Sequence, residues 1–206
     1  MEPKTNKKNS IIYHGEIVAG SLLIRESRMI AGLLLENADS NQWHQATEIE
    51  NILQKRSPAA AKRQAKLIRN RLILMKPELW EMIREGSADI AVQAALAATI
   101  KHSRLVGDFM DTVIRQNWLI FSKKITSRDW EEFFETCIQI DTNVGNWTES
   151  TRKKLKQVVF RIMAESKYIA STRNPELQPV SVLPEIIGYL NKYSEDYVLR
   201  CMRVTE

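Results

Sequence analysis

The sequence predicts an all-α fold, with a helix-turn-helix-like N-terminal half and a small winged-helix hairpin in the C-terminal half. Apolar residues recur at helical spacing along most of the 206 positions, and only seven glycines and six prolines interrupt them. With 44% hydrophobic and 27% charged residues, the composition is that of a globular protein that can bury a core. We therefore expect helices throughout and at most one short hairpin, near residues 168–182.

Three helices are expected in the first part of the chain. The first spans residues 20–37, the second spans residues 42–53, and the third begins at Pro58. Ser57 is suited to accept hydrogen bonds from the free amides of the third helix, and a proline at the first helical position loses no hydrogen bond. The second and third helices have helix-turn-helix proportions. The expected buried stripe of the third helix comprises Ala61, Ala65, Ile68, Leu72 and Met75.

The later helices follow from proline starts, glycine ends and apolar periodicity. We expect them at residues 77–85, 87–102, 104–120, 127–140, 148–167, 184–193 and 194–202. β-Branched residues on both sides of the turn at Asn174 and Pro175 predict the hairpin, and helix, helix, hairpin is the order of a winged-helix module. The polar segment 122–128 is the expected boundary between domains. The chain is therefore expected to consist of a disordered tail (1–10), an N-terminal helical domain with the helix-turn-helix-like basic helix (11–122) and a C-terminal helical, winged-helix-like domain (123–206).

Positive charge is concentrated in one segment. Residues 55–71 hold seven lysines and arginines and no acidic residue, although the whole chain has 30 basic against 25 acidic residues. Solvated helix faces usually mix the two signs, and like charges repel one another unless an anionic partner neutralises them. Release of counterions from DNA is the commonest way in which this happens. We therefore predict contact with double-stranded DNA, and a plain solvated face or an acidic protein partner are the alternatives.

The predicted DNA-binding residues form two clusters, the second at the start of the helix over 148–167. Four residues of the first cluster and its helix are eligible to read bases: Arg63, Gln64, Arg69 and Asn70. Phosphate contact alone would nevertheless explain the composition. The complete predicted set is Lys55, Arg56, Lys62, Arg63, Lys66, Arg69, Asn70, Arg71, Arg152, Lys153, Lys154 and Lys156.

No catalytic site, metal site or cofactor is expected. The glycines of GEIVAGSLL are not followed by the Lys-Ser/Thr pair that a phosphate loop requires. His14, His44 and His102 are scattered and lack the spacing of zinc ligands. Glu165 and Lys167 match half of a restriction-type nuclease site, yet no carboxylate-bearing strand is expected beside them. A minimal nuclease is therefore the least favoured alternative, and a non-enzymatic protein is expected.

The chain is expected to be cytoplasmic. Cys137 and Cys201 are far apart and belong to no Cys-x-x-Cys pair, which favours a reducing compartment. The longest apolar run, residues 90–100, is about half of the roughly 20 residues that a membrane-spanning helix needs. The basic start of the chain leads into no apolar segment typical of a signal peptide. We therefore expect neither a membrane nor a small-molecule substrate as a partner.

Seven segments of the sequence form a recognisable series: GSLL (20–23), RESRMIAGLLLE (25–36), ENILQKRSPAAAKRQAKLIRNRL (50–72), KPELWEMIREG (76–86), AVQAALAATIKHSRLVGDFM (91–110), WTESTRKKLKQVVFRIMAESKYI (147–169) and VLP (182–184). Together they resemble the BrxA family of bacterial BREX phage-defence systems. None is a catalytic motif. The resemblance implies a small, nearly all-helical, non-enzymatic protein that binds DNA and works beside other BREX proteins. The alternative function is an adaptor that docks on acidic surfaces of other defence components.

Overall fold

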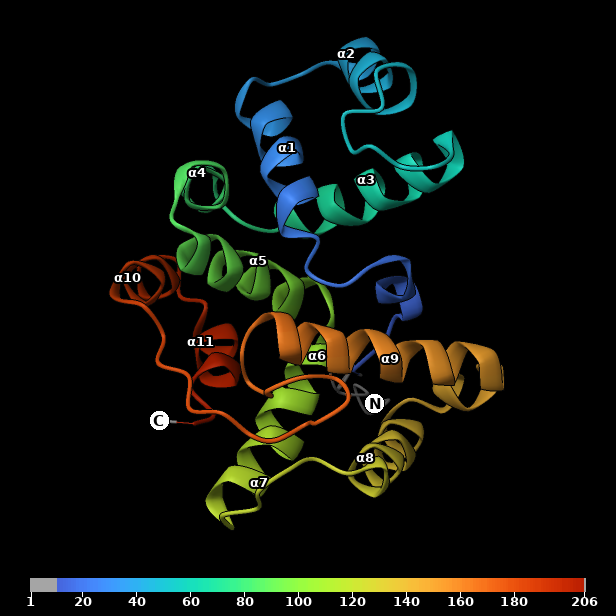
Figure 1. Ribbon diagram of the computed structural model, residues 1–206, viewed down its shortest axis with the longest axis vertical. Helices are drawn as coiled ribbons and strands as arrows, with labels where there is room; N and C mark the ends of the chain where they lie inside the picture. Colours follow the sequence, from blue (N-terminus) through green and yellow to red (C-terminus); the bar gives the residue numbers. More distant parts are fainter. Residues whose placement is uncertain (1–10, 206) are drawn as a thin grey trace, which may run out of the picture.

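A computed structural model describes residues 11–205, and over that range the chain folds into helices joined by loops (Figure 1). The all-α prediction is confirmed, and the predicted tail, residues 1–10, lies outside the described residues. None of the described helices combines the length and apolarity that crossing a bilayer would require. The longer helices are α1 (Ile24–Leu35), α3 (Pro58–Leu72), α4 (Pro77–Glu85), α5 (Ala88–His102), α8 (Ser127–Ile140), α9 (Glu149–Glu165), α10 (Pro184–Lys192) and α11 (Asp196–Met202).

Two further helices contain a turn of π-helix. Helix α2 (Ser40–His44) continues directly into the π-helical turn Gln45–Ile49. Helices α6 (Arg104–Asp108) and α7 (Arg115–Leu119) are joined by the π-helical turn Phe109–Ile114, so that they form one continuous rod. The rod matches the helix expected over 104–120, but the π-helical turn in its middle was not predicted.

Helix α5 lies at the centre of the molecule (Figure 1). It packs against α1, α3 and α4 on one side and against α6, α10 and α11 on the other. Its residues 94–98 are all buried and four of the five are alanines, which lets neighbouring helices approach closely. A helix that is apolar nearly all round is expected only in the interior of a protein.

One continuous hydrophobic core extends across the predicted domain boundary at residues 122 and 123. The ring of Phe109, in the first half, lies 5.6 Å from Trp130, 5.3 Å from Phe133 and 5.9 Å from Phe160, all in the second half. Aromatic pairs at these spacings each stabilise a fold by about 0.5–1.5 kcal/mol beyond the area they bury. The division into two domains stays a prediction, and the core is shared between its two parts.

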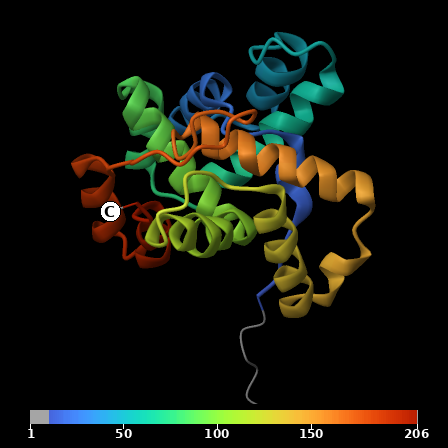
Figure 2. The same ribbon diagram turned by 60° about the horizontal axis from the view of Figure 1, so that its bottom comes forward.

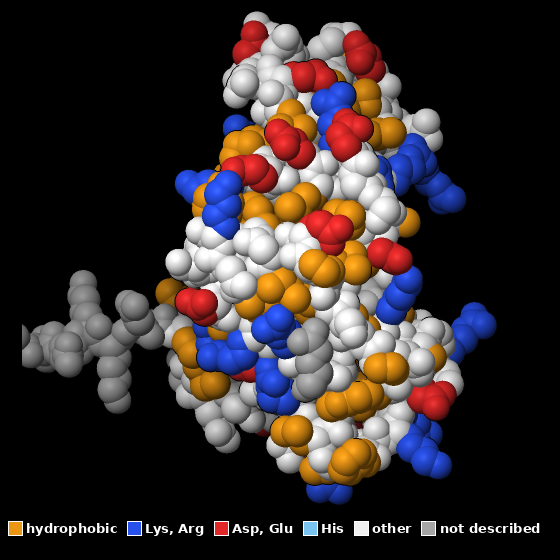
Figure 3. All heavy atoms as spheres, turned by 90° about the vertical axis from the view of Figure 1, so that its left-hand side faces the viewer, with side chains coloured by type: hydrophobic (Ala, Val, Ile, Leu, Met, Phe, Trp, Pro, Cys, Tyr) orange, Lys and Arg blue, Asp and Glu red, His pale blue; other side chains and the backbone are white. Residues whose placement is uncertain are grey.

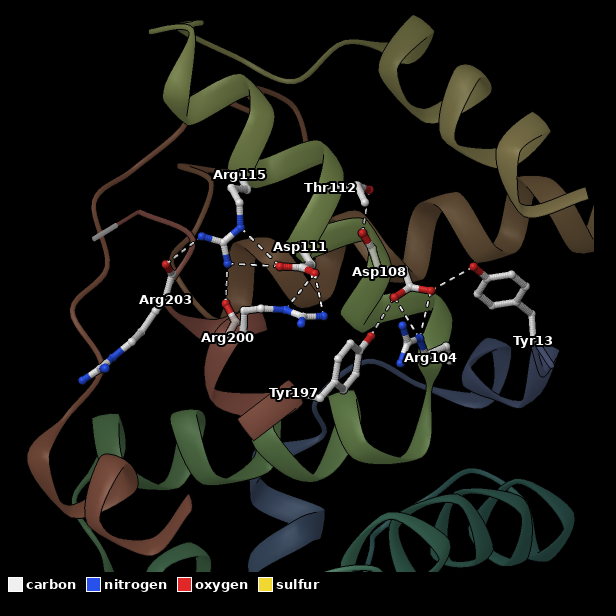
Figure 4. A network of polar contacts seen from close by, with 9 residues as sticks. All are labelled: Tyr13, Arg104, Asp108, Asp111, Thr112, Arg115, Tyr197, Arg200 and Arg203. Carbon is white, nitrogen blue, oxygen red and sulfur yellow. Dashed lines mark hydrogen bonds and ion pairs between the residues drawn. The ribbon is translucent and has the colours of Figure 1, made fainter. Parts of the chain in front are cut away.

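Two aspartates on the rod of α6 and α7 anchor distant segments of the chain (Figure 4). The carboxylate of Asp108 accepts hydrogen bonds from the hydroxyl groups of Tyr13 and Tyr197, both at 2.9 Å. One turn further on, Asp111 lies 3.0 Å from the guanidinium of Arg200. The N-terminal segment and α11 are therefore fixed to the same rod.

The winged-helix prediction for residues 168–182 is not confirmed. The segment turns back on itself, and the Ala170 amide donates to the Glu176 carbonyl at 2.8 Å. However, the described residues contain only isolated antiparallel bridges, Ile169 with Leu177 and Lys124 with Glu176, and no strand. Pro175 lies within the turn and has no amide hydrogen to donate to a ladder.

The helix-turn-helix prediction is not confirmed either. The second helix ends at Ile49 and α3 begins at Pro58, so residues 50–57 separate them, more than the roughly three or four residues of that motif. Ile49, the last residue of the π-helical turn, is 62% exposed. Helix α1 starts at Ile24 rather than residue 20, since Leu23 has a left-handed backbone (φ 54°).

Alanine substitutions at two glycines are expected to change the free energy of unfolding in opposite directions. A Cβ atom at Gly107 would lie 2.2 Å from the Tyr197 hydroxyl oxygen, so Gly107→Ala would push α11 away from α6. We expect a loss of about 1–3 kcal/mol in the free energy of unfolding. Gly188, inside α10, has open space where a Cβ would be, so Gly188→Ala should instead stabilise by about 0.5–1 kcal/mol. Urea unfolding of both variants measures this difference, and equal effects would contradict the packing described for Tyr197.

Candidate nucleic-acid interface

Helix α3 forms as its sequence dictates. The Ser57 hydroxyl accepts a hydrogen bond from the Ala60 amide at 3.3 Å, and Pro58 occupies the first helical position. The predicted stripe is buried in its entirety: Ala61, Ala65, Ile68, Leu72 and Met75. The helix contains no aspartate or glutamate, so its outer face has no acidic partner of its own.

Four basic side chains project from the outer face of α3. Lys62, Arg63, Lys66 and Arg69 are all exposed, and Arg56 is exposed just before the helix begins. On the side of the molecule with α4 and α10, by contrast, acidic and basic side chains are interspersed (Figure 3). Hereafter the α3 face denotes Arg56, Lys62, Arg63, Lys66, Arg69 and Asn70.

A shallow groove of about 360 Å³ separates the α3 face from α2 and the π-helical turn that follows it. The guanidinium of Arg69 lies over the ring of Trp43, 5.3 Å from its centroid. Lys66 and Asn70 line the same groove. A guanidinium held against an aromatic ring loses less freedom when it binds a ligand, because its orientation is already restricted.

One acidic residue borders the groove. Glu48 lies 3.3 Å from the ammonium group of Lys62 and 3.4 Å from a ring nitrogen of His44. The hydrogen bond with His44, followed by the contact with Lys62, lowers the pKa of Glu48, so its carboxylate stays charged. Glu48 therefore compensates one cation of the face, while Arg56, Arg63 and Lys66 have no ion-pair partner within the part of the chain that the structure describes.

The structure corrects the assignment of Arg71 to the DNA-binding set. Arg71 is only 2% exposed, and its guanidinium donates hydrogen bonds to the backbone carbonyls of Gly20 and Ser21. Burial lowers the pKa of Arg71 to about 10, even though nearby Glu165 acts to raise it, so the group stays charged at neutral pH. The density of charge in the sequence predicted that Arg71 points outward, but its side chain instead donates to two carbonyl acceptors inside the fold.

Lys55 is also engaged within the fold. Its ammonium group lies 2.5 Å from Oε1 of Glu26 on α1, and the two side chains are only 19% and 13% exposed. Breaking such a pair would leave a desolvated charge behind, which costs several kcal/mol. Lys55 therefore fixes the loop before α3 and does not belong to the exposed face.

The second predicted cluster, on α9, is divided between different environments. Arg152 is used internally, since its guanidinium donates to the carbonyls of Trp147 at 3.1 Å and Gly145 at 2.7 Å. Its assignment as a DNA contact stays a prediction, since the side chain is half-buried. Three lysines remain at the surface: Lys153 pairs with Glu149, Lys154 is exposed, and Lys156 turns toward a separate cavity.

The two residues that matched half of a nuclease site contact different parts of the fold. The carboxylate of Glu165 accepts hydrogen bonds from the Ser21 hydroxyl at 2.7 Å and from the Leu22 amide at 2.9 Å. Lys167 pairs with Asp89 at 2.8 Å. Among the described residues no group of three or more histidine, cysteine, aspartate or glutamate side chains is arranged to hold a metal ion.

Sequence reasoning missed three further cations, Lys124, Arg161 and Arg173, which line the same cavity as Lys156. They are far apart in sequence, so no local charge density identified them. One signal was present: residues 150–164 contain five basic residues and no acidic residue, which extends the basic character of α9 beyond the cluster at its start.

Comparisons with known proteins agree with this fold. The model of the BrxA family matches residues 11–194. The chain belongs to the BrxA family. Two relatives named BREX protein BrxA are similar to it. The one from Paramagnetospirillum magneticum is 45% identical, and the match covers 94% of this chain and 97% of the relative. The one from Escherichia coli O9:H4 is 32% identical, and the match covers 91% of this chain and 88% of the relative. The resemblance to a family of BREX phage-defence systems is therefore confirmed.

A solved structure shares the architecture as well. A crystal structure of an uncharacterized protein from Magnetospirillum magneticum superimposes with a TM-score of 0.86 at 44% identity. The match covers 93% of this chain and 98% of the other. The BrxA-family chain thus shares its fold with that protein over nearly its whole length.

The two kinds of arginine on α3 lead to opposite predictions. Arg71→Ala should lower the free energy of unfolding by about 2–4 kcal/mol, because it leaves two buried carbonyls without donors. Arg63→Ala should change it by less than about 0.5 kcal/mol, since Arg63 is exposed and makes no ion pair in the described chain. Thermal and urea unfolding measure both. Similar stabilities for the two variants would contradict the internal role of Arg71.

Proposed function

We propose that this chain is a non-enzymatic accessory protein of a BREX phage-defence system that binds double-stranded DNA through the α3 face. The observation that carries the proposal is the uncompensated charge of that face. Arg63 and Lys66 are exposed beside Arg56 and Arg69, and Glu48 is the one acidic residue that lines the neighbouring groove. The phosphates of a DNA backbone would supply the missing negative charge, and release of their counterions would favour binding.

The dimensions of α3 suit this role. Its 15 residues span about 22 Å at the usual rise of an α-helix, and such a helix can lie along the backbone or enter the major groove. Phosphate contacts would position the protein without selecting a sequence. Arg69 and Asn70, at the groove beside Trp43, are the residues best placed to contact base edges. Lys153 and Lys154 of α9 are proposed as additional phosphate contacts.

A charge-reversal pair with a matched control tests the proposed face. Arg63→Glu with Lys66→Glu should weaken binding to a duplex roughly tenfold or more, because it turns phosphate attraction into repulsion. Lys76→Glu with Lys123→Glu alters the net charge equally, at exposed positions outside the face, and should have a much smaller effect. Gel shift or fluorescence anisotropy measures affinity, and unchanged melting temperatures show that both variants fold. Equal losses in the two variants would refute the α3 face as the binding site.

The salt dependence of the same binding supplies a second readout. If four to six phosphates are contacted, the logarithm of the affinity should fall with the logarithm of salt concentration at a slope of roughly −4 to −5. Lys66→Ala should make the slope shallower by about one and weaken different duplex sequences almost equally. A salt-independent affinity would mean that α3 serves another kind of partner.

A second candidate function, an adaptor for other BREX proteins, is favoured by the exposed apolar end of α7. Leu119 and Ile120 are 62% and 61% exposed, and Phe121 is 92% exposed on a left-handed backbone (φ 56°). Such a tip contributes nothing to the core and suits insertion into a partner. Lys123 and Lys124 follow it, so an acidic partner surface would complement it.

The adaptor function predicts that Phe121→Ser strongly weakens association with another protein of the same system. Truncating a central aromatic anchor costs about 2 kcal/mol or more, roughly a thirtyfold loss of affinity. Calorimetry with each purified BREX protein measures the affinity. The control variant is Ile140→Ser, at another exposed apolar position. If the variant keeps the wild-type affinity for every BREX protein that wild type binds, the apolar tip is excluded as the docking site.

A further inference from the structure

A cavity of about 660 Å³ lies away from the α3 face, between the start of α8, the middle of α9 and the turn near residue 173. Helices α8 and α9 lie on the same side of the molecule in both ribbon views (Figure 1 and Figure 2). The volume of the cavity falls within the roughly 300–1,000 Å³ that is typical of small-molecule sites.

Four cations line this cavity and no acidic residue does. They come from three separate segments: Lys124 before α8, Lys156 and Arg161 on α9, and Arg173 in the turn. Among the described residues, Glu131 is the one acidic side chain within ion-pair distance of any of them, with its carboxylate 3.9 Å from the Lys156 ammonium, at the limit of an ion pair. Glu176 pairs with Lys124 through an isolated backbone bridge and does not line the cavity. No ion pair involves the other three within the described chain.

Basic residues on α5 and on the rod of α6 and α7, by contrast, have acidic partners. Arg104 pairs with Asp108 at 2.9 Å, Arg115 with Asp111 at 3.1 Å, and Lys101 with Glu195 at 2.6 Å. Four like charges around a concave surface repel one another and focus a positive potential into the cavity. A bound anion with several charged oxygens would relieve that repulsion.

The remaining lining residues define the ligand more closely. The ring of Phe160 forms an apolar wall, and its contacts with Phe109 and Trp130 hold it in place. Ser127 and Thr172 add hydroxyl groups that can donate to phosphate oxygens. An aromatic wall beside cations and hydroxyls matches a molecule with an aromatic base at one end and phosphates at the other.

The cavity walls are also held in position without a ligand. The Ile125 amide donates to the Pro175 carbonyl, and the Leu177 amide donates to the Lys123 carbonyl, both at 3.0 Å. These bonds join the segment before α8 to the turn that bears Arg173. Binding would therefore require little ordering of the backbone, which lowers its entropic cost.

We propose that this cavity binds the phosphate groups of a nucleotide, with Arg161 and Arg173 as the principal ligands. Arginine offers two parallel donors to phosphate oxygens, and these two guanidinium groups have no ion pair in the described chain to give up. The nucleotide is either a free nucleoside polyphosphate or a residue of a nucleic-acid strand, since both present the same phosphate chemistry. The inference does not rest on duplex binding by the α3 face.

Calorimetric or fluorescence titration with three probes tests the proposal: ATP, inorganic pyrophosphate and a short single-stranded oligodeoxynucleotide. The test variant is Arg161→Ala with Arg173→Ala, and the control is Lys76→Ala with Lys123→Ala, which removes the same charge outside the cavity. We expect the test variant to lose roughly tenfold or more in affinity for at least one probe and the control to stay within about twofold of wild type. Unchanged melting temperatures are expected, because neither arginine makes an ion pair in the described chain.

The pattern across the probes identifies the source of the phosphate. Loss of ATP and pyrophosphate binding indicates a free nucleotide, and loss confined to the oligonucleotide indicates a strand. Arg63→Glu with Lys66→Glu should leave the affected probe's affinity within about twofold, which separates this site from the α3 face. The proposal is overturned if wild type binds none of the probes, or if the test and control variants bind every probe equally.

Discussion

A buried arginine connects the two halves of this molecule. Arg71, on α3, donates to the carbonyls of Gly20 and Ser21, and the carboxylate of Glu165, on α9, accepts from the Ser21 hydroxyl and the Leu22 amide. The short segment before α1 is thus held between a guanidinium from the first half and a carboxylate from the second. The two carbonyl acceptors offset part of the cost of burying the Arg71 charge, although Arg71 Nε has no hydrogen-bond partner among the described residues, and Glu165 itself is exposed.

The same arginine determines which side of α3 faces outward. Side chains on a helix are separated by about 100°, so fixing Arg71 and Ile68 toward the interior leaves Lys62, Arg63 and Lys66 directed to solvent. The basic character of the exposed face and the burial of Arg71 therefore have one geometric cause. A helix rotated by even a quarter turn would expose the apolar stripe and bury unpaired lysines, both at a large energetic cost.

Local signals predicted the helices well, and long-range contacts explain what was missed. Ser57 with Pro58 marked the start of α3 correctly, because capping and proline geometry depend on neighbouring residues alone. The roles of Arg71 and Arg152 were missed because their acceptors are backbone carbonyls, which any residue supplies and no sequence pattern reveals. Likewise, Arg161 and Arg173 meet only after a loop folds back over α9, so composition could not bring them together.

Exposure decides which paired lysines remain able to bind a phosphate. Lys62 and Glu48 are 70% and 24% exposed, and a surface pair of this kind is worth about 0–1 kcal/mol, so Lys62 can exchange the carboxylate for a phosphate at little cost. Lys55 and Glu26 are both largely buried, and separating them would leave a desolvated charge. Two lysines of one basic segment thus differ in role: Lys55 holds the loop before α3 in place, and Lys62 is available to a ligand. The density of charge in a sequence sets an upper limit on the number of side chains available to an anionic ligand, and the depth of each ion pair determines which of them stay available.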